Sequence, residues 1–354
     1  MTNRGVLIRP FSFIKNLNDC REEQPLATVK WGILSTANIG RTQLIPAIKR
    51  ADLAEVVAIA SRGSQVHEVA AELQIPRAYE SYDALLEDQE IDAVYIPLPN
   101  HLHKEWVLKA AEKGKHVLCE KPLALTAQEA EEIVAACEKH GVKYMEAFMY
   151  QFHPQHQRVR DIIASGEIGE VKLFKSSHSF FLNDREGDIR IKKEMGGGAI
   201  YDIGCYSIHV LRTVLQAEPV LAKGIAKQDA NNDVDLSSFI YLEMENGIPA
   251  AIDCSFDMTG RNEYEVVGTK GTIRVPFAFR PDLNGGVGLV ITQVNGMVRE
   301  EKVNGDIYRL EVEHFSQAIL NDSQPLQTGT SSIQNMRVIE ACYEAVETGK
   351  MVKI

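Results

Sequence analysis

The sequence predicts an α/β protein: a parallel sheet covered by helices, followed by an α+β domain whose large, open sheet is mainly antiparallel. Between Val29 and Met149, short runs rich in valine and isoleucine alternate with helical patterns, which is typical of repeated strand-helix units. After Pro154, apolar runs follow one another across turn residues, which is typical of an antiparallel meander. A chain of 354 residues, 45% of them hydrophobic, is long enough to build both cores.

Five strands are expected in the first half, each almost continuously apolar because a strand covered on both faces has no solvent side. They are residues 29–34, 55–61, 92–98, 116–119 and 142–148. Helices are expected between them at residues 64–73, 102–113 and 127–139. Thr126 can cap the last of these helices at its N-terminus, and Gly141 can end it.

The second half is expected to begin with a helix at residues 154–165 and a strand at residues 170–181. Meandering strands follow at residues 220–229, 236–244, 250–258, 264–275 and 288–303, and helices 308–320 and 332–348 end the chain. Strong turn signals stand at Asn246-Gly247, Lys270-Gly271 and Asn295-Gly296. We therefore divide the chain into an N-terminal extension (1–27), a first domain (28–150) and a second domain (151–354).

The composition limits the possible partners and the location of the protein. A net charge of -11 and a pI near 5.5 argue against nucleic acid or an anionic membrane as a partner, since both attract clustered lysine and arginine. No apolar run reaches the roughly 20 residues of a membrane helix. The six cysteines lie far apart, which predicts no metal site and favours reduced thiols in the cytoplasm. The extension lacks a secretory signal, and its acidic residues disfavour the alternative of an organelle-targeting peptide.

The turn after the first strand has the position of a dinucleotide-binding loop. Where the usual motif has three glycines, this chain has Ser35, Ala37 and Gly40, so only the glycine that packs against the helix remains. Small side chains still allow a pyrophosphate to approach the free amides at a helix N-terminus. A purely structural tight turn is the alternative. The expected cofactor contacts in this turn are Ser35, Thr36, Ala37, Asn38 and Ile39.

The residues after the second strand favour NADP(H) over NAD(H). Proteins that prefer NAD usually place an acid about 20 residues further on, where it holds the adenosine ribose hydroxyls. This chain has Ser61 and Arg62 there instead. A serine hydroxyl can donate to a 2′-phosphate, and an arginine can pair with that phosphate while stacking on adenine. If Arg62 is instead an ordinary surface arginine, NAD(H) remains possible.

Three blocks of sequence resemble one family of oxidoreductases. They read Ile-Pro-Leu-Pro-Asn-His-Leu-His at residues 96–103, Gly-Lys-His-Val-Leu-Cys-Glu-Lys-Pro at 114–122 and Gly-Gly-Gly-Ala-Ile-Tyr-Asp-Ile-Gly-Cys-Tyr at 196–206. From about Val29 onward the chain resembles the Gfo/Idh/MocA family, and within it the branch of NADP-dependent aldose (xylose) dehydrogenases, trans-dihydrodiol dehydrogenases and glucose-fructose oxidoreductase. The resemblance implies a Rossmann domain and an α+β domain whose open sheet forms an oligomer interface, and hence a homodimer or homotetramer.

The resemblance also implies roles for residues in these blocks. It places Asn100 and His103 near the nicotinamide half of the cofactor and Glu120 beside the ring, and it makes Lys121 the central catalytic lysine. Tyr206 stands where related inositol dehydrogenases have a histidine, which favours the sugar and dihydrodiol branch. The expected cofactor contacts from the first two blocks are Pro97, Leu98, Asn100, His103, Glu120 and Lys121.

Oxidation of a carbinol requires a group that takes the hydroxyl proton. Tyr206 is the candidate base: a free phenol has a pKa of about 10, and an adjacent Lys121 ammonium would lower it towards neutrality. Lys121 could also hydrogen-bond the substrate oxygen. If residues 198–215 form a helix, Asp202, Tyr206 and His209 project from one face and line the substrate cleft. Asp202 then binds substrate hydroxyls or fixes the helix start, and a core role is the alternative for Tyr206 and His209.

Two further residues are candidate substrate contacts. Arg190 precedes the glycine run and could hydrogen-bond a sugar from a loop, with a surface arginine as the alternative. Tyr150 lies in the segment that joins the two domains.

The sequence thus predicts an NAD(P)-dependent oxidoreductase that transfers hydride between its cofactor and a carbinol carbon of a sugar or polyol. A sugar 3-ketoreductase, which would use the same lysine and tyrosine in the reductive direction, is the first alternative. The second alternative is a non-catalytic regulator that senses dinucleotides, and the retention of Lys121 and Tyr206 argues against it.

Overall fold

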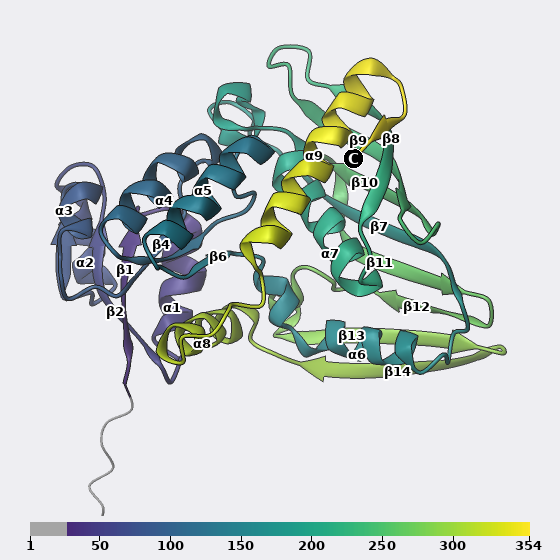
Figure 1. Cartoon of the computed structure of the whole chain (residues 1–354), viewed down its shortest axis with the longest axis horizontal. Coiled ribbons are helices and arrows are strands. Elements are labelled where there is room, and N and C mark those ends of the chain that lie inside the picture. The colour runs from purple at the N-terminus through teal and green to yellow at the C-terminus, as the bar shows by residue number, and fades with distance from the viewer. Residues whose placement is uncertain (1–26) are drawn as a thin grey trace, which may run out of the picture.

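The computed structural model describes residues 27–354, which form two lobes, each built on a sheet (Figure 1). Residues 1–26, nearly all of the expected extension, lie outside the described part, so that expectation stays a prediction. No helix of the described part is both long and apolar enough to cross a membrane.

The first sheet is parallel, and within residues 27–354 its strand order is β3-β2-β1-β4-β5-β6. The order reverses between β1 and β4, and at such a reversal the loops that follow the strands diverge and leave a crevice. The five predicted strands are confirmed; sequence reasoning missed β3, because its three residues are half-buried at the sheet edge and form no apolar run. The strands are β1 (Val29–Leu34), β2 (Ala54–Ala60), β3 (Arg77–Tyr79), β4 (Ala93–Ile96), β5 (His116–Cys119) and β6 (Tyr144–Glu146).

The helices predicted for the first lobe are confirmed. Thr126 Oγ1 accepts the Glu129 N–H at 3.1 Å, and Gly141 has a φ of 67° just beyond the helix, so the helix of residues 127–139 begins and ends as expected. A short additional helix, α3, is capped by Ser81. The helical elements are η1 (Gly40–Leu44), α1 (Ile45–Ile48), α2 (Gln65–Glu72), α3 (Tyr82–Leu86), η2 (Asn100–Leu102), α4 (His103–Glu112) and α5 (Ala127–Lys139).

The second sheet has the order β14-β13-β12-β11-β7-β10-β9-β8-β15 within the described residues. All its neighbouring strands are antiparallel except β7 and β10, so the sheet is mixed but mainly antiparallel, as expected. The strands expected at residues 264–275 and 288–303 are each interrupted by the turn signal that they contain, which makes them parts of hairpins. The strands are β7 (Val171–Phe181), β8 (Pro219–Gln228), β9 (Asp235–Met244), β10 (Pro249–Ser255), β11 (Asp257–Gly268), β12 (Gly271–Val275), β13 (Val287–Val294), β14 (Met297–Asn304) and β15 (Val352–Lys353).

Helices α7 and α9 pack on one face of this sheet, against β7 and β8. The helix expected at residues 198–215 is divided into a π-turn, η6, and the α-helix α7, so Asp202 and Tyr206 belong to different elements. Such π-turns occur frequently at functional sites. The helices are η3 (Met149–Phe152), α6 (Pro154–Ala164), η4 (Ile189–Ile191), η5 (Lys193–Met195), η6 (Ile200–Gly204), α7 (Cys205–Leu215), η7 (Pro281–Asn284), α8 (Ile307–Leu320) and α9 (Gly329–Thr348).

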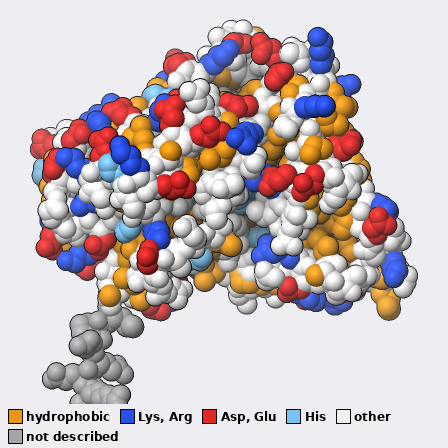
Figure 2. Space-filling model, in the orientation of Figure 1, with side chains coloured by type: hydrophobic (Ala, Val, Ile, Leu, Met, Phe, Trp, Pro, Cys, Tyr) orange, Lys and Arg blue, Asp and Glu red, His pale blue; other side chains and the backbone are white. Residues whose placement is uncertain are grey.

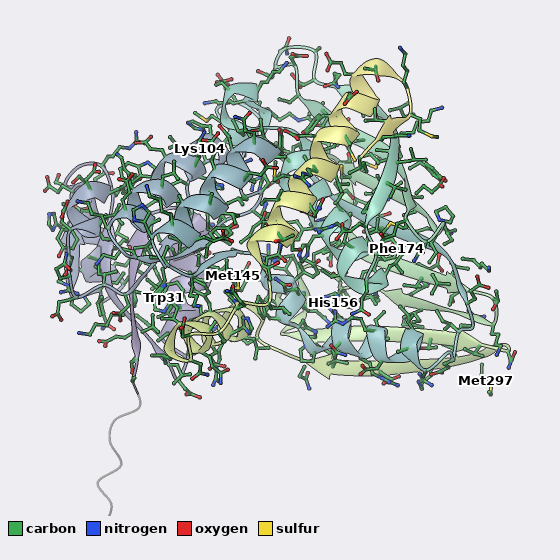
Figure 3. The ribbon with its side chains drawn as sticks, in the orientation of Figure 1. Trp31, Lys104, Met145, His156, Phe174 and Met297 are labelled. Carbon is green, nitrogen blue, oxygen red and sulfur yellow. The ribbon has the colours of Figure 1, made fainter. Side chains whose placement is uncertain are left out.

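Helix α8 joins the lobes, because it belongs to the second half of the chain but packs on the first sheet. The rings of Trp31 in β1 and Phe315 in α8 have their centroids 5.8 Å apart, and Trp31 Nε1 donates to Ser316 Oγ at 3.3 Å. Figure 3 labels Trp31 inside the first lobe and Phe174 inside the second. The lobes are therefore tied together by a buried contact as well as by the chain between them.

The outer face of the second sheet carries exposed apolar side chains. Ile225 on β8 pairs with Phe239 on β9, and Tyr241 lies further along β9; these side chains are 68%, 47% and 39% exposed. Figure 2 shows hydrophobic side chains gathered in the right-hand part of the molecule, where the strands lie. Hydrophobic residues scattered singly over a surface are ordinary, whereas neighbouring ones form a larger patch of this kind.

Candidate active site

A cavity of about 970 Å³ opens where the order of the first sheet reverses, and it extends to η6 and α7 of the second lobe. Residues from loops, helices and strands that are distant in the sequence line it. The predicted site residues in its wall are Ser35, Thr36, Ala37, Asn38, Ile39, Ser61, Arg62, Pro97, Leu98, Asn100, Glu120, Lys121, Arg190, Asp202 and Tyr206.

The turn after β1 fits a dinucleotide although its first glycine is absent. Ser35 adopts a φ of 131°, a region that ordinarily requires glycine. The Ser35 hydroxyl accepts the Ala37 N–H at 2.8 Å and so helps to hold this conformation. Strained backbone of this kind is found mostly where function requires it. The turn is therefore better explained as a binding loop than as a plain structural connection.

The far corner of the cavity, beyond β2, is formed by Ser61, Arg62 and Tyr82. The Thr36 hydroxyl donates to Ser61 Oγ at 3.5 Å, which links this corner to the first turn. Burial raises the pKa of Tyr82, and the nearby Arg62 guanidinium opposes that rise. In the described part of the chain, the acids that line the cavity are Glu120 and Asp202, and neither lies in this corner. The corner thus suits a 2′-phosphate better than a pair of free ribose hydroxyls.

At the other end of the cavity, Asp202 lies between two cations. Lys121 Nζ donates to the Asp202 backbone carbonyl at 2.8 Å and to its Oδ1 at 3.1 Å, and Arg190 Nε donates to Oδ2 at 2.8 Å. Burial would raise the pKa of Asp202, but the Lys121 ammonium and the Arg190 guanidinium outweigh it and hold the pKa well below its usual range. In return, Asp202 raises the pKa of Lys121 against the opposing effect of burial. Both groups are therefore charged at neutral pH.

Tyr206 lies beside Lys121, but the two are not hydrogen-bonded. Lys121 Nζ lies 5.0 Å from the centroid of the Tyr206 ring, and the Tyr206 hydroxyl donates to Met149 Sδ at 3.6 Å. Burial raises the pKa of Tyr206 well above its usual value. The expectation that Lys121 lowers this pKa is therefore wrong for this structure, because the ammonium faces the ring and is paired with Asp202. The phenol is held in its protonated form.

The loops that follow β4 and β5 are each anchored by a hydrogen bond. The Tyr95 hydroxyl donates to Glu120, and burial raises the pKa of the Glu120 carboxyl. Asn100 Nδ2 donates to the Gly196 carbonyl at 2.8 Å, which connects the loop after β4 to the glycine run before η6. The first contact holds the neighbour of Lys121 within the first lobe, and the second ties the loop after β4 to the second lobe, to which Lys121 itself is held by Asp202.

The structure does not bring three predicted residues into the cavity. His103 is fully buried, with its ring nitrogens 2.9 and 2.8 Å from the carbonyl oxygens of Pro122 and Leu98. Tyr150 and His209 are also fully buried, and the Tyr150 hydroxyl lies 2.6 Å from His209 Nδ1. All three lie outside the cavity lining, and their polar atoms have protein partners there. They support the residues in front of them instead of facing a ligand.

Sequence reasoning also missed residues that line the cavity. His178 lies on β7, where some of the inward-facing positions are polar. Because side chains alternate between the two faces of a strand, this polar position could have been recognised in the sequence. His101 belongs to the block at residues 96–103, where only its neighbours were chosen as candidates, and the remaining residues belong to no block, so only the fold brings them to the site. The missed residues with polar or aromatic side chains are Thr42, Gln43, Tyr82, His101, His178, Phe180, Arg280 and Tyr308.

Fold and cavity together define a class of protein: one with a Rossmann-type domain, which binds dinucleotides where its strand order reverses, and a second, sheet-rich domain that completes the cavity. More narrowly, the chain belongs to the GFO/IDH/MocA oxidoreductase family. Residues 29–148 match the oxidoreductase family with the NAD-binding Rossmann fold, and residues 156–274 match the GFO/IDH/MocA C-terminal domain. The family resemblance inferred from the sequence is confirmed.

Several members of this family are similar to the chain over most of its length. It is 41% identical over 326 residues to a D-xylose 1-dehydrogenase (NADP(+)) of Haloferax volcanii, and the alignment covers 92% of this chain and 99% of that protein. It is 31% identical over 310 residues to a trans-1,2-dihydrobenzene-1,2-diol dehydrogenase of Xenopus tropicalis, with 82% and 89% covered. Among solved structures, a 3-ketoreductase from Actinomadura kijaniata in complex with NADP and TDP-benzene matches with a TM-score of 0.84 at 30% identity, over 91% of this chain and 98% of that one.

Proposed function

We propose that this protein transfers hydride between NADP(H) and a carbinol carbon of a sugar or polyol. The observation that carries the proposal is the joint placement of Lys121, Asp202 and Tyr206 at one end of a cavity whose other end is formed by Ser61 and Arg62. The xylose dehydrogenase and the dihydrodiol dehydrogenase supply the substrate class, and the xylose dehydrogenase and the ketoreductase supply the preference for NADP.

Each residue of the cluster has a distinct role in the proposal. The bound cofactor supplies or accepts the hydride. The Lys121 ammonium stabilises negative charge on the substrate oxygen, and Asp202 holds Lys121 in place and keeps it charged. The Tyr206 hydroxyl exchanges the proton of that oxygen. Arg190, which is bound to the other carboxylate oxygen of Asp202, orients the cluster and reaches the substrate from its loop.

The raised pKa of Tyr206 favours a second candidate, a sugar 3-ketoreductase. A protonated phenol is ready to donate a proton to the oxygen of a carbonyl that is being reduced, whereas oxidation of an alcohol requires the phenolate. The ketoreductase among the similar structures has this direction in its name. Comparing the rates of D-xylose oxidation and of reduction of a keto sugar with the same preparation distinguishes the two candidates.

The decisive experiment measures reduction of NADP and of NAD by purified protein with D-xylose, D-glucose, an inositol and trans-cyclohexane-1,2-diol. Turnover with at least one of these and NADP is expected, and Lys121→Ala should abolish most of it. Lys104→Ala is the matched control, because Lys104 on α4 is half-buried outside the cavity lining and pairs with Glu132 of α5 at 2.7 Å (Figure 3). Tight NADP binding without any turnover would instead support the dinucleotide-sensing regulator.

The same proposal includes a homodimer or homotetramer that assembles through the outer face of the second sheet. Ile225, Phe239 and Tyr241 would be covered in such an assembly. Light scattering at micromolar concentration should give a multiple of 39.4 kDa. Phe239→Lys should lower that mass, and a monomeric wild-type protein would contradict the proposal.

We also propose a cytoplasmic location. The five cysteines of the described part are free and buried, which suits a reducing compartment. Fractionation of cells that express the full chain tests this, and recovery with a membrane or in an organelle would contradict it.

A further inference from the structure

One buried histidine differs from the others in its hydrogen bonding. The structure buries His103, His153, His156, His178 and His209. In four of them, both ring nitrogens lie within hydrogen-bond distance of a protein atom. His178 is the exception within the described residues, because its Nδ1 is buried without a partner, and the nearby Ile203 backbone only partly offsets the effect of burial on the pKa of the ring. A buried polar atom without a partner is unfavourable, so its retention needs an explanation.

The position of His178 offers that explanation. Its ring stacks on Phe279, with the centroids 4.6 Å apart and the planes at 22°, and it meets the Tyr206 ring edge-on at 5.3 Å. It also lines the cavity, next to the proposed proton donor. The imidazole is therefore held in place by aromatic contacts at the edge of the cavity, while its Nδ1 has no partner in the described part of the protein.

A second unpartnered polar group lines the same part of the cavity. The Tyr308 hydroxyl, at the start of α8, is buried and has no hydrogen-bond partner among the described residues. Arg280 lies near it, and its guanidinium is engaged with Asp282 at 2.9 and 2.8 Å. His178 and Tyr308 come from elements about 130 residues apart. A local irregularity of one loop therefore does not explain why both side chains have an unpartnered polar atom.

The charge of this wall restricts what it can bind. Burial lowers the pKa of His178 to about 3, and burial raises the pKa of Tyr308, so both side chains are neutral near pH 7. The Arg280 charge is offset by Asp282. A neutral imidazole can donate and accept, and a phenol can do the same, which matches hydroxyl groups.

We propose that His178 and Tyr308 hydrogen-bond hydroxyl groups on carbons beyond the reacting one, and that they thereby select a neutral polyol over a simple diol or an anionic sugar. The proposal rests on the proposed function and defines its substrate class more narrowly. A site built to hydrogen-bond a hydroxyl discriminates against the analogue that lacks it, because its own polar groups then stay unpaired.

The test compares kcat/KM for D-xylose with kcat/KM for trans-cyclohexane-1,2-diol, which lacks the further hydroxyls. His178→Phe keeps the aromatic stack on Phe279, and Tyr308→Phe removes only the hydroxyl. In each variant the ratio of the two values should fall about ten-fold. Tyr264→Phe is the matched control, since its buried hydroxyl lies 3.1 Å from His156 Nδ1 and does not line the cavity. Equal losses on both substrates, or an unchanged ratio, would overturn the inference.

Two measurements separate this inference from folding defects and from failure of the proposed function. Without ligand, Tyr308→Phe should unfold at the wild-type temperature or above, because it removes an unpartnered hydroxyl, whereas Tyr264→Phe should unfold earlier. If the wild type turns over none of the sugars, the proposed function fails. Calorimetric titration of the NADP-loaded protein with D-xylose then decides the inference alone. A Kd for D-xylose about ten-fold higher in His178→Phe than in the wild type supports it. An unchanged Kd, or a lower Kd for D-xylonate than for D-xylose, contradicts it.

Discussion

The proposed cofactor end of the cavity, around Ser35 and Ser61, is formed by backbone turns and small side chains of the first lobe. The proposed substrate end, around Lys121, Asp202 and Tyr206, is formed by charged and aromatic side chains that both lobes contribute. At the first end, Ser35 and Ala37 leave room for a ligand. At the second end, Asp202 and Tyr206 meet Lys121 only because two domains are packed together. A dinucleotide cofactor is the same for many proteins of one fold, and backbone geometry can recognise it. Substrates differ between such proteins and are recognised by side chains, which can vary within one fold.

The largest expected effect belongs to the substrate end. Lys121→Ala and Tyr206→Phe should each lower kcat by roughly 100-fold or more, the usual scale for a positioned acid-base or charge-stabilising group. The double variant should lose much less than the product of the two single effects, because both groups act on one substrate oxygen. Turnover measured at saturating NADP and D-xylose gives these values. If Tyr206→Phe turns over at the wild-type rate, another group handles the proton.

At the cofactor end, Arg62→Ala should weaken NADP binding about 10- to 150-fold, the equivalent of one charge-assisted hydrogen bond, and should change NAD binding far less. Fluorescence titration with both cofactors measures this. Arg41→Ala is the matched control, since Arg41 lies in η1 close to the same loop but pairs with Glu72 at 2.8 Å outside the cavity lining. Equal weakening of both cofactors would indicate that Arg62 stacks on the adenine instead of pairing with a phosphate.

The pH dependence of the reaction rate and of NADP affinity should also distinguish the two ends of the cavity. Because burial raises the pKa of Tyr206, the phenol stays protonated through the neutral range, and its small ionised fraction grows about ten-fold with each pH unit. Polyol oxidation, which needs the ionised form, should therefore rise with pH above 7, while carbonyl reduction, which needs the protonated form, should stay level. Rate profiles in both directions measure this, and Tyr206→Phe should flatten the oxidative one. NADP affinity should not follow the same curve.

Much of the fold could be predicted from the sequence, because buried parallel strands are continuous apolar runs and hairpins carry their own turn residues. The turn after β1 could be singled out as a candidate cofactor loop for a similar reason, since it follows the strand directly and its chemistry is local; its contacts with the cofactor stay a prediction. The substrate end was predicted only in part. Lys121, Asp202 and Tyr206 belong to recognisable motifs, but His178 and Tyr308 reach the cavity through packing over long sequence distances. The same packing buried Tyr150 and His209 behind the wall and raised the pKa of Tyr206.

The smallest expected effect tests whether the cofactor end depends on backbone conformation. Ser35→Gly and Ser35→Ala both remove the hydroxyl that accepts the Ala37 N–H, so the two variants lose the same hydrogen bond. Only glycine relieves the φ of 131°, whereas alanine keeps the strain. Ser35→Gly should therefore be more stable than Ser35→Ala by about 1 kcal/mol, since the relief of strain exceeds the greater unfolded-state entropy of glycine. Urea unfolding gives the difference, and NADP titration should rank the variants in the same order. If the alanine variant is as stable as the glycine variant, residue 35 is not strained, and the loop would owe its shape to side-chain contacts such as those that build the substrate end.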